Sequence, residues 1–423
     1  MSADSPDLSR SRAELLDAAD PLAEFRTRFV VADPDLIYLD GNSLGRLPVS
    51  TAERIRTAIE DEWGRGLIRS WAAWIDLPRR VGDAIAAGVV EARPGEVLVG
   101  DSTTVNLYKL AVAALDARPE RRVIVTDDDN FPTDLYVFQG LAHARKLELR
   151  IVHSDIDAGL DPAVLDAALD EDVALVSLSH VAYRSGALLD MAAVTAAAHR
   201  VGALILWDLS HSAGSVPVPL TSSGADLAVG CTYKYLNGGP GAPAFLYVRS
   251  ELQEQLQQPI WGWFGQRDQF AMGGMYDPQP GIERFAVGTP PVLGLYGAEE
   301  GVRMIAEAGV LRLRGKGAAL TSYLVELADA WLAPLGFTVA SPRNADQRGS
   351  HVSLHHPQAW QVCQALIERG RVIPDFRTPD RLRLGLAALT PSFADVWDAT
   401  DRLRRLVEAE EHLEYPGERS RVT

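Results

Sequence analysis

The sequence predicts an α/β protein in which a large domain, built on a mostly parallel sheet covered by helices, is joined to a smaller α/β domain at the C-terminus. Between residues 96 and 248 short apolar runs alternate with helical patterns, which is typical of βαβ units. The chain has 423 residues, and 47% of them are hydrophobic, which is enough for two domains with sizeable cores. We expect a large domain over 51–335, a small domain over 336–423, and an N-terminal segment, 1–50, that joins the small domain.

In the large domain, apolar runs bounded by turn residues predict strands, and amphipathic patterns between them predict helices. Ser50, with Glu53 three positions later, predicts a capped helix over about 51–62. Strands are expected at 96–100, 122–126, 148–152, 173–178, 203–207, 227–231 and 244–248. Helices are expected at 104–116, 132–145, 161–169 and 190–200, and a helical pattern dominates 291–333.

The two ends of the chain predict the remaining α/β elements. Residues 11–30 have a helical pattern that Pro21 interrupts, and a short strand follows at 36–39. Further strands are expected at 337–340, 351–355, 371–375 and 381–386, with helices at 358–369 and 393–411.

Composition argues against several classes of function. The formal net charge is -16 and no basic run occurs, which argues against a nucleic-acid partner. No apolar run approaches the length of a membrane span, and the polar N-terminus lacks the apolar core of a signal peptide. The two cysteines, Cys231 and Cys363, lie in apolar segments, so we expect buried thiols in a reducing cytoplasm.

The stretch from Ala203 to Tyr235 places an acid and a lysine at the ends of two predicted strands. Asp208 ends the first apolar run, His211 follows three residues later, and Lys234 follows the second run. Ligands of parallel sheets bind outside the carboxyl ends of the strands. A lysine that forms a Schiff base with pyridoxal phosphate (PLP) needs an acid for the pyridinium nitrogen, and this pair fits that chemistry. Taken alone, the same pair fits a surface lysine and a helix-capping aspartate equally well.

Other strand ends carry polar or aromatic side chains. Thr103 and Thr104 lie where a strand meets a helix; such N-termini bind phosphate, although an ordinary hydroxyl cap has the same pattern. Phe131 could stack on a flat cofactor ring, and Asp134 could orient the cofactor or cap the following helix. Ser179 follows the strand expected at 173–178. The carboxyl ends of these strands meet at one edge of the sheet, so the loops that carry these side chains converge there. This shared position favours a common binding site over unrelated helix caps.

Motifs outside the sheet pattern predict further walls of a pocket. Trp71 and Trp74 lie in an expected loop and predict a binding wall, with aromatic packing under the loop as the alternative. Arg383 could hold a substrate carboxylate with two parallel hydrogen bonds, whereas Arg381 fits a surface position on an edge strand better. The nine histidines show no metal-ligand spacing, so no metal site is expected.

In ten stretches that cover most of the chain in order, the sequence resembles the kynureninases, PLP enzymes of fold type I that are related to the class V aminotransferases. The most specific of these is a strand followed by D-x-x-H and then by T-Y-K-Y-x-N-x-G-P-G. The stretches are YLDGNSLGRLP (38–48), IRSWAAWIDLP (68–78), DSTTVNLYKL (101–110), NFPTD (130–134), HVAYRSG (180–186), DLSHSAGSVPV (208–218), CTYKYLNGGPGAPAFLYV (231–248), GWFG (262–265), ERFAVGTPP (283–291) and LRLGLAALTPSF (382–393).

The resemblance implies a role for each matching residue. Lys234 would hold PLP as a Schiff base, Asp208 would pair with the ring nitrogen, and Tyr233 would hold the phosphate region together with Thr103 and Thr104. In the reaction that the resemblance implies, Tyr233 is also placed to share in proton transfer. The other cofactor contacts that it implies are Thr103, Thr104, Phe131, Asp134, Ser179 and His211, together with Trp263 and Thr289 from the second subunit of a homodimer with shared active sites. The substrate contacts that it implies are Asn42, Trp71 (or Trp74), Gly288, Thr289 and Arg383.

The reaction that the resemblance implies is the hydrolysis of L-kynurenine to anthranilate and L-alanine, with cleavage of the Cβ–Cγ bond. Eukaryotic members carry Asn at the position of Thr289, so this chain has the bacterial form, which implies preference for kynurenine over 3-hydroxykynurenine. One alternative is another class V enzyme, an aminotransferase or a cysteine desulfurase, although neither cysteine fits a nucleophile on a flexible loop. The other is a PLP-fold binding protein without catalysis, against which the intact Asp208, His211 and Lys234 argue.

Overall fold

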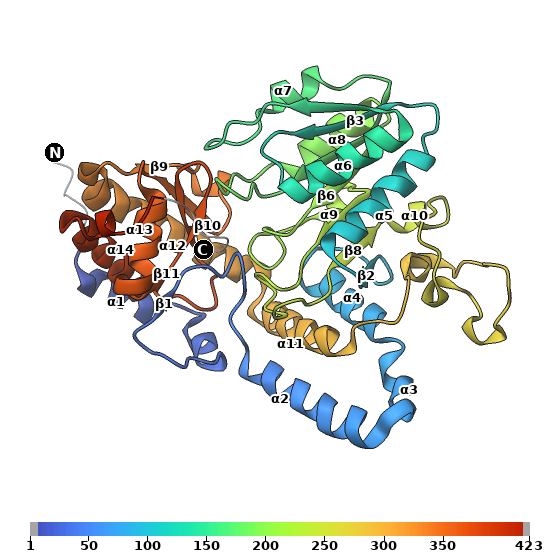
Figure 1. The fold of residues 1–423 in the computed structure, drawn as a ribbon, viewed down its shortest axis with the longest axis horizontal. Helices are drawn as coiled ribbons and strands as arrows, with labels where there is room; N and C mark the ends of the chain where they lie inside the picture. Colours follow the sequence, from blue (N-terminus) through green and yellow to red (C-terminus); the bar gives the residue numbers. More distant parts are fainter. Residues whose placement is uncertain (1–6, 418–423) are drawn as a thin grey trace.

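The computed structural model describes residues 7–417, which form two lobes (Figure 1). The larger lobe holds a seven-stranded sheet, and the smaller lobe holds a four-stranded sheet with its own helices. The N-terminal segment, blue in Figure 1, lies beside the orange and red C-terminal elements, so the two ends of the described chain meet in the smaller lobe.

All seven strands predicted in the large domain form, and they lie in one sheet. They are β2 (Val97–Val99), β3 (Val123–Asp127), β4 (Glu148–Val152), β5 (Val173–Ser179), β6 (Leu204–Asp208), β7 (Leu227–Gly230) and β8 (Phe245–Val248). The order across the sheet is β2-β8-β7-β6-β5-β3-β4, and every neighbouring pair is parallel except the two pairs of β8. β8 follows β7 without a crossover helix, and strands joined directly pair antiparallel. The mostly parallel sheet is confirmed.

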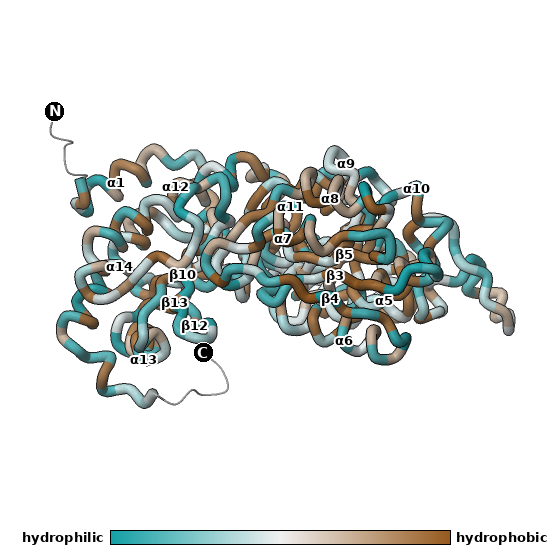
Figure 2. The backbone as a smooth tube through the Cα atoms, turned by 90° about the horizontal axis from the view of Figure 1, so that it is seen from above, coloured by the Kyte–Doolittle hydropathy of each residue, from teal (hydrophilic) through white to brown (hydrophobic). Residues whose placement is uncertain are grey.

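Helices cover both faces of this sheet because its strands are apolar on both sides. Along β6, Leu204 and Leu206 join one hydrophobic core, whereas Ile205 and Trp207 join the other. Figure 2 shows the apolar strands, coloured brown, between the covering segments. The helices of the larger lobe are α4 (Leu77–Gly88), α5 (Thr103–Asp116), α6 (Pro132–Arg145), α7 (Pro162–Ala167), α8 (Met191–Arg200), α9 (Leu220–Ser223), α10 (Ser250–Gln253) and α11 (Val292–Ala308).

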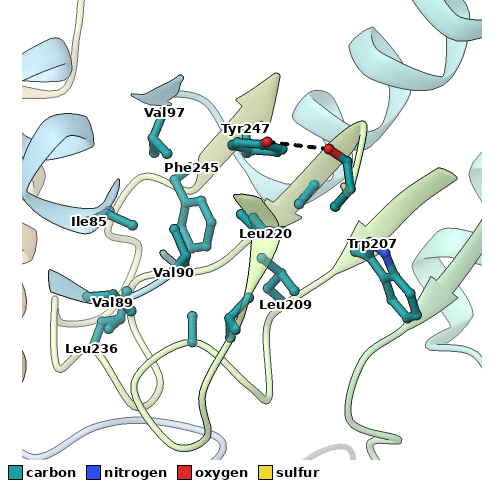
Figure 3. Packing of buried hydrophobic residues seen from close by; sticks show 14 of the residues in the cluster. Ile85, Val89, Val90, Val97, Trp207, Leu209, Leu220, Leu236, Phe245 and Tyr247 are labelled. Carbon is teal, nitrogen blue, oxygen red and sulfur yellow. Dashed lines mark hydrogen bonds between the residues drawn. The ribbon is translucent and has the colours of Figure 1, made fainter. Parts of the chain in front are cut away.

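Aromatic side chains fill the core between helix α4 and the end of the sheet formed by β2 and β8. Phe245 and Tyr247 of β8 face Ile85 of α4 and Val97 of β2, and all four are buried (Figure 3). The Tyr247 hydroxyl donates a hydrogen bond of 3.3 Å to the Ala225 carbonyl, so this buried polar group is satisfied. The packing gives the loops at the end of the sheet a rigid base.

The smaller lobe joins the two ends of the chain around a third core. Its core contains Ala13, Ile37 and Leu39 from the N-terminal segment, and helix α12 reaches both lobes because Leu313 lies in the large-lobe core and Leu320 in this one. The sheet has the order β12-β13-β10-β9, and β1 pairs with β11 in parallel. The elements are α1 (Arg10–Ala18), β1 (Ile37–Tyr38), α12 (Val310–Leu327), β9 (Thr338–Val339), β10 (His351–His355), α13 (Ala359–Ala365), β11 (Val372–Ile373), β12 (Asp375–Arg377), β13 (Arg381–Gly385) and α14 (Phe393–Glu408).

Two predictions about local structure were wrong. The strand predicted at 371–375 is split into β11 and β12, which pair in different sheets, because Pro374 has no N–H for a continuous ladder. Ser50 does not cap a helix: α2 (Val49–Thr57) starts one residue earlier, after Pro48, without a side-chain cap.

The loop predicted around the two tryptophans is also wrong, because Trp71–Trp74 form the short helix α3. The chain stays helical from α2 through residues 58–70, and Glu62 fixes this path. Its carboxylate accepts a 2.6 Å hydrogen bond from the Trp74 indole, and its carbonyl accepts one of 2.7 Å from Ser70.

Among residues 7–417, no helix combines the length and the apolar character that a membrane span requires.

Candidate active site

A cavity of about 550 Å³ lies at the carboxyl edge of the seven-stranded sheet. Strands β2, β3, β6 and β7 all end there, so their following loops provide most of the wall. The lining residues are Ser43, Leu44, Asp101, Ser102, Thr103, Thr104, Phe131, Thr133, Asp134, Asp208, Ser210, His211, Tyr233, Lys234, Pro240, Gly241, Ala242 and Ala244. A pocket at this edge is the expected ligand site of a parallel α/β sheet.

Lys234 is the only one of the four lysines in the sequence that lines this cavity. Lys109 and Lys316 are buried in ion pairs with aspartates, and Lys146 is exposed at the end of α6. A single amine inside a pocket is the arrangement that covalent attachment of a carbonyl compound needs.

The surroundings of Lys234 hold its amine over the cavity. Its Nζ lies 3.4 Å from His211 Nε2 and 5.7 Å from the centre of the Phe131 ring. The loop before the lysine is pinned from the N-terminal segment, because the Gly45 N–H donates a 2.8 Å hydrogen bond to the Tyr233 carbonyl. A Cβ at Gly45 would collide with the Lys234 carbonyl, so this close approach requires glycine.

Two buried acids lie next to each other in the wall of the cavity. Asp208 ends β6, and its Oδ1 accepts a 2.7 Å hydrogen bond from the Ser210 N–H. Asp134 of α6 is buried, and burial together with the neighbouring Asp208 carboxylate raises the pKa of Asp134 well above its usual range. Its Oδ2 has no hydrogen-bond partner. Asp134 therefore holds its proton more strongly than an exposed aspartate does, and Asp208, at the end of β6, lies beside it in position to pair with a cation.

His211 and Tyr233 stay uncharged near the lysine. Burial and the Lys234 cation lower the pKa of His211 well below its ordinary value, so its ring is neutral. Burial raises the pKa of the Tyr233 hydroxyl, which therefore keeps its proton at neutral pH. Both side chains can exchange hydrogen bonds with a ligand without adding charge to the cavity.

The N-terminus of α5 forms one end of the cavity. Ser102 caps this 14-residue helix by accepting a hydrogen bond from the Val105 N–H, and Thr103 and Thr104 are its first residues. The first N–H groups of a helix have no partner within it, and the helix dipole favours an anion there. Two hydroxyls and free N–H groups make this end suitable for a phosphate.

Phe131 forms an aromatic wall, with Ser179 behind it. The Phe131 ring packs edge-on against Tyr183 at 5.3 Å between ring centres, and 37% of the residue remains exposed. Ser179 does not line the cavity; its hydroxyl donates a 2.9 Å hydrogen bond to Asn130, the residue before Phe131. A flat ring could stack on the free face of Phe131, and Ser179 acts on that wall only through Asn130.

Arg383 and Asn42 lie behind the cavity wall. Arg383 is buried, and its Nε donates a 2.9 Å hydrogen bond to Asp375. The Asn42 amide, oriented to satisfy both groups, accepts from Arg383 Nε at 2.9 Å and Nη2 at 3.1 Å. Arg383 Nη2 also donates to the Ser43 hydroxyl at 2.9 Å, and Ser43 lines the cavity. Neither Ser43 nor Asp375 is among the residues that the sequence predicted for the site, although Ser43 stands beside Asn42 in the same glycine-bounded loop.

Four of the expected site residues lie apart from the cavity of their own chain. Trp71 packs against Phe264, with ring centres 6.1 Å apart. Trp263 is 44% exposed, and Gly288 and Thr289 are exposed beside a separate small hollow. Within residues 7–417 no group of three or more His, Cys, Asp or Glu side chains is arranged to hold a metal ion.

Comparison with known proteins identifies the family. Residues 313–403 match the kynureninase C-terminal domain. The kynureninase of Pseudomonas fluorescens is 46% identical over 408 residues, which cover 95% of this chain and 96% of that protein. That of Burkholderia pseudomallei strain K96243 is 46% identical over 410 residues, with the same coverage of both proteins. This chain belongs to the kynureninase family.

Solved structures similar to this kynureninase-family chain share its fold at low sequence identity. A cysteine desulfurase from Thermococcus onnurineus NA1 has a TM-score of 0.79 and 20% identity, covering 91% of this chain and 98% of that one. The cysteine desulfurase CsdA from Escherichia coli has a TM-score of 0.78 and 17% identity, covering 92% and 98%. A C-DES variant with glycine covalently linked to its PLP cofactor has a TM-score of 0.76 and 19% identity, covering 88% and 97%. The fold is that of PLP fold type I.

The cavity of this kynureninase-family chain fits PLP. Lys234 offers the amine for the aldehyde, Asp208 offers the carboxylate for the ring nitrogen, and Phe131 offers a ring face. The N-terminus of α5 suits the phosphate. Oδ2 of Asp134, buried beside Asp208, is a further polar atom without a partner that a bound group could satisfy.

Proposed function

We propose that this chain catalyses the PLP-dependent hydrolysis of L-kynurenine, in which kynurenine and water give anthranilate and L-alanine by cleavage of the Cβ–Cγ bond. The observation that carries the proposal is that Lys234, alone among the lysines, shares a cavity with a strand-end aspartate and a helix N-terminus. The kynureninases that match this chain over almost its full length support the substrate.

When bound, PLP supplies an electron-accepting ring that stabilises negative charge on a substrate carbon. Lys234 would hold the cofactor, and its Nζ would be the base that takes the α-proton of the substrate. Neutral His211, 3.4 Å away, can accept a hydrogen bond from that amine. The Tyr233 hydroxyl keeps its proton and can deliver it to a developing negative charge.

The two buried acids, Asp208 and Asp134, have different roles. Asp208 would bind the protonated ring nitrogen, which keeps the ring electron-poor. The raised pKa of Asp134 favours its protonated form, which can donate a hydrogen bond to Asp208. Thr103 and Thr104 would hold the phosphate at the N-terminus of α5.

The substrate carboxylate is assigned to the Ser43 side of the cavity. Arg383 provides the positive charge there, and Asn42 fixes its guanidinium. Asp375 already pairs with Arg383, so binding of a carboxylate would proceed through Ser43 or by exchange with Asp375.

We also propose a homodimer in which Trp263 and Thr289 complete the cavity of the partner subunit. The yellow segment around residues 260–290 extends from the side of the larger lobe away from the smaller one (Figure 1). It exposes large apolar side chains that a second copy would cover: Trp261 58%, Trp263 44%, Phe270 69%, Met272 71% and Met275 84%. Gly288 and Thr289 add no large hydrogen-bonding group for a 3-hydroxyl, which supports preference for kynurenine.

The rival reading as a cysteine desulfurase lacks its nucleophile. Both cysteines of the sequence, Cys231 and Cys363, are buried, and burial raises the pKa of each thiol. A nucleophilic cysteine has to be accessible and readily ionised. Buried free thiols also fit the cytoplasmic location that we propose.

The test is product formation by the purified protein with PLP. With L-kynurenine we expect anthranilate fluorescence and an equal amount of alanine, and Lys234→Ala should form neither. With L-cysteine we expect no sulfide. Release of sulfide without anthranilate would favour a cysteine desulfurase instead. If neither anthranilate nor sulfide formed, an enzymatic role on these two substrates would be refuted.

A further inference from the structure

Lys109 is a second cation close to the cavity, and it has no part in the chemistry above. It lies on α5 and is buried. Its Nζ is 2.8 Å from Asp101 Oδ2 and 2.9 Å from the carbonyl oxygen of Phe285. Placing an ammonium in such surroundings costs solvation free energy, which its partners must offset. One of these partners is Asp101, so the ion pair connects Lys109 to the loop before α5.

Asp101 is an acid in an unfavourable place for phosphate binding. It directly precedes Ser102, the cap of α5, and it lines the same cavity as Thr103 and Thr104. Its side chain keeps 30% of its surface exposed, so an unpaired carboxylate there would repel a phosphate held by the helix N-terminus.

The backbone at Asp101 is also held in an uncommon conformation. Its φ is +53°, in the left-handed region that residues other than glycine seldom adopt. The loop is bonded to the start of β8, where the Ala244 N–H donates to the Asp101 carbonyl at 3.0 Å. The ion pair with Lys109 fixes the carboxylate of the same residue, so both the backbone and the side chain of Asp101 are held in place.

We propose that Lys109 is a positioning residue for the cofactor phosphate. It cancels the charge of Asp101 beside the N-terminus of α5 and holds the turn that presents the first N–H groups of this helix to the cavity. Through the Phe285 carbonyl it also ties this turn to the segment that leads to Gly288 and Thr289. The inference rests on the proposed function, because it assumes that this helix N-terminus receives the PLP phosphate.

The experiment compares two buried lysine–aspartate pairs. Lys316 is also buried and lies 2.8 Å from Asp20, but Asp20 does not line the cavity, whereas Asp101, the partner of Lys109, does. Apoproteins of Lys109→Met and the control Lys316→Met are titrated with PLP, and the dissociation constant and the thermal midpoint of the apoprotein are measured. We expect both variants to lose thermal stability, while PLP affinity falls at least about tenfold only in Lys109→Met. Equal PLP affinity in Lys109→Met and wild type, or equal weakening in the control, would overturn the inference.

A second comparison isolates the charge, and its Asp101→Asn arm is informative even if Lys109→Met does not fold. Asp101→Asn removes the repelling carboxylate, so it should bind PLP as tightly as wild type or more tightly. The double variant Lys109→Met/Asp101→Asn has no unpaired charge and should recover most of the lost affinity. A double variant that binds as weakly as Lys109→Met, or an Asp101→Asn variant weakened about tenfold, would contradict the charge argument. If wild type itself binds no PLP, the proposed function fails first; if only these comparisons fail, the proposed function stands without Lys109.

Discussion

Replacing Asp134 with Asn tests the assignment of protons in the cavity. Burial and the Asp208 carboxylate raise the pKa of Asp134 well above 3.8, the ordinary value of an aspartate, so the native state keeps a proton that the unfolded chain releases. Between these two pKa values the native state binds one proton more, and the free energy of unfolding falls as the pH rises. Asparagine carries no titrating proton and can donate the same hydrogen bond to Asp208.

The size of the effect follows from one proton. The free energy of unfolding of wild type should fall relative to Asp134→Asn by up to about 1.4 kcal/mol for each pH unit in this window. Urea unfolding of both apoproteins at a series of pH values from about pH 5 upward measures this slope. Exposed Asp155, whose pKa backbone hydrogen bonds lower, serves as a control, because Asp155→Asn should show no such trend above pH 5. A difference between wild type and Asp134→Asn that does not change with pH, or that changes in the opposite direction, would refute the assignment.

Three further outcomes follow from the proposed function. Asp208→Asn should keep PLP but lower turnover by orders of magnitude, and turnover within about tenfold of wild type, or 1.4 kcal/mol, would remove Asp208 as the ring partner. The kcat/KM for kynurenine should exceed that for 3-hydroxykynurenine, and equal values would contradict the argument from Gly288 and Thr289. Inactive Lys234→Ala and Trp263→Ala proteins, unfolded and refolded together, should regain up to about a quarter of wild-type activity, because half of the dimers are mixed and each has one intact site. No recovery despite proven subunit exchange would place Trp263 in the site of its own chain.

The fold of the larger lobe could be predicted because its signals are local. Apolar runs such as Ala203 to Trp207 are long enough to identify a strand, and Asp208 marks its end. The wrong predictions lie where a single residue or a side-chain hydrogen bond overrides the hydrophobic pattern. Pro374 divides a predicted strand, and Glu62 holds Trp74 on a helical path that no periodicity indicates.

The same distinction separates the site residues. Lys234, Asp208 and Phe131 follow strands of one sheet, so the topology alone brings them into one cavity. The position of Arg383 depends on its pairing with Asp375 inside the smaller lobe, which sequence spacing does not encode. Trp263 would reach a cavity only in the proposed homodimer, and the geometry of a dimer is not encoded in the local pattern of one chain.

Attachment of PLP to Lys234 is the most direct test of the whole account. The protein loaded with PLP is reduced with borohydride and digested, and the peptides are examined by mass spectrometry. The chain has only four lysines, so each can be followed. We predict a phosphopyridoxyl group on Lys234 and on neither Lys109, Lys146 nor Lys316. Attachment to one of those three, or bound PLP with no reducible link to any lysine, would contradict the account.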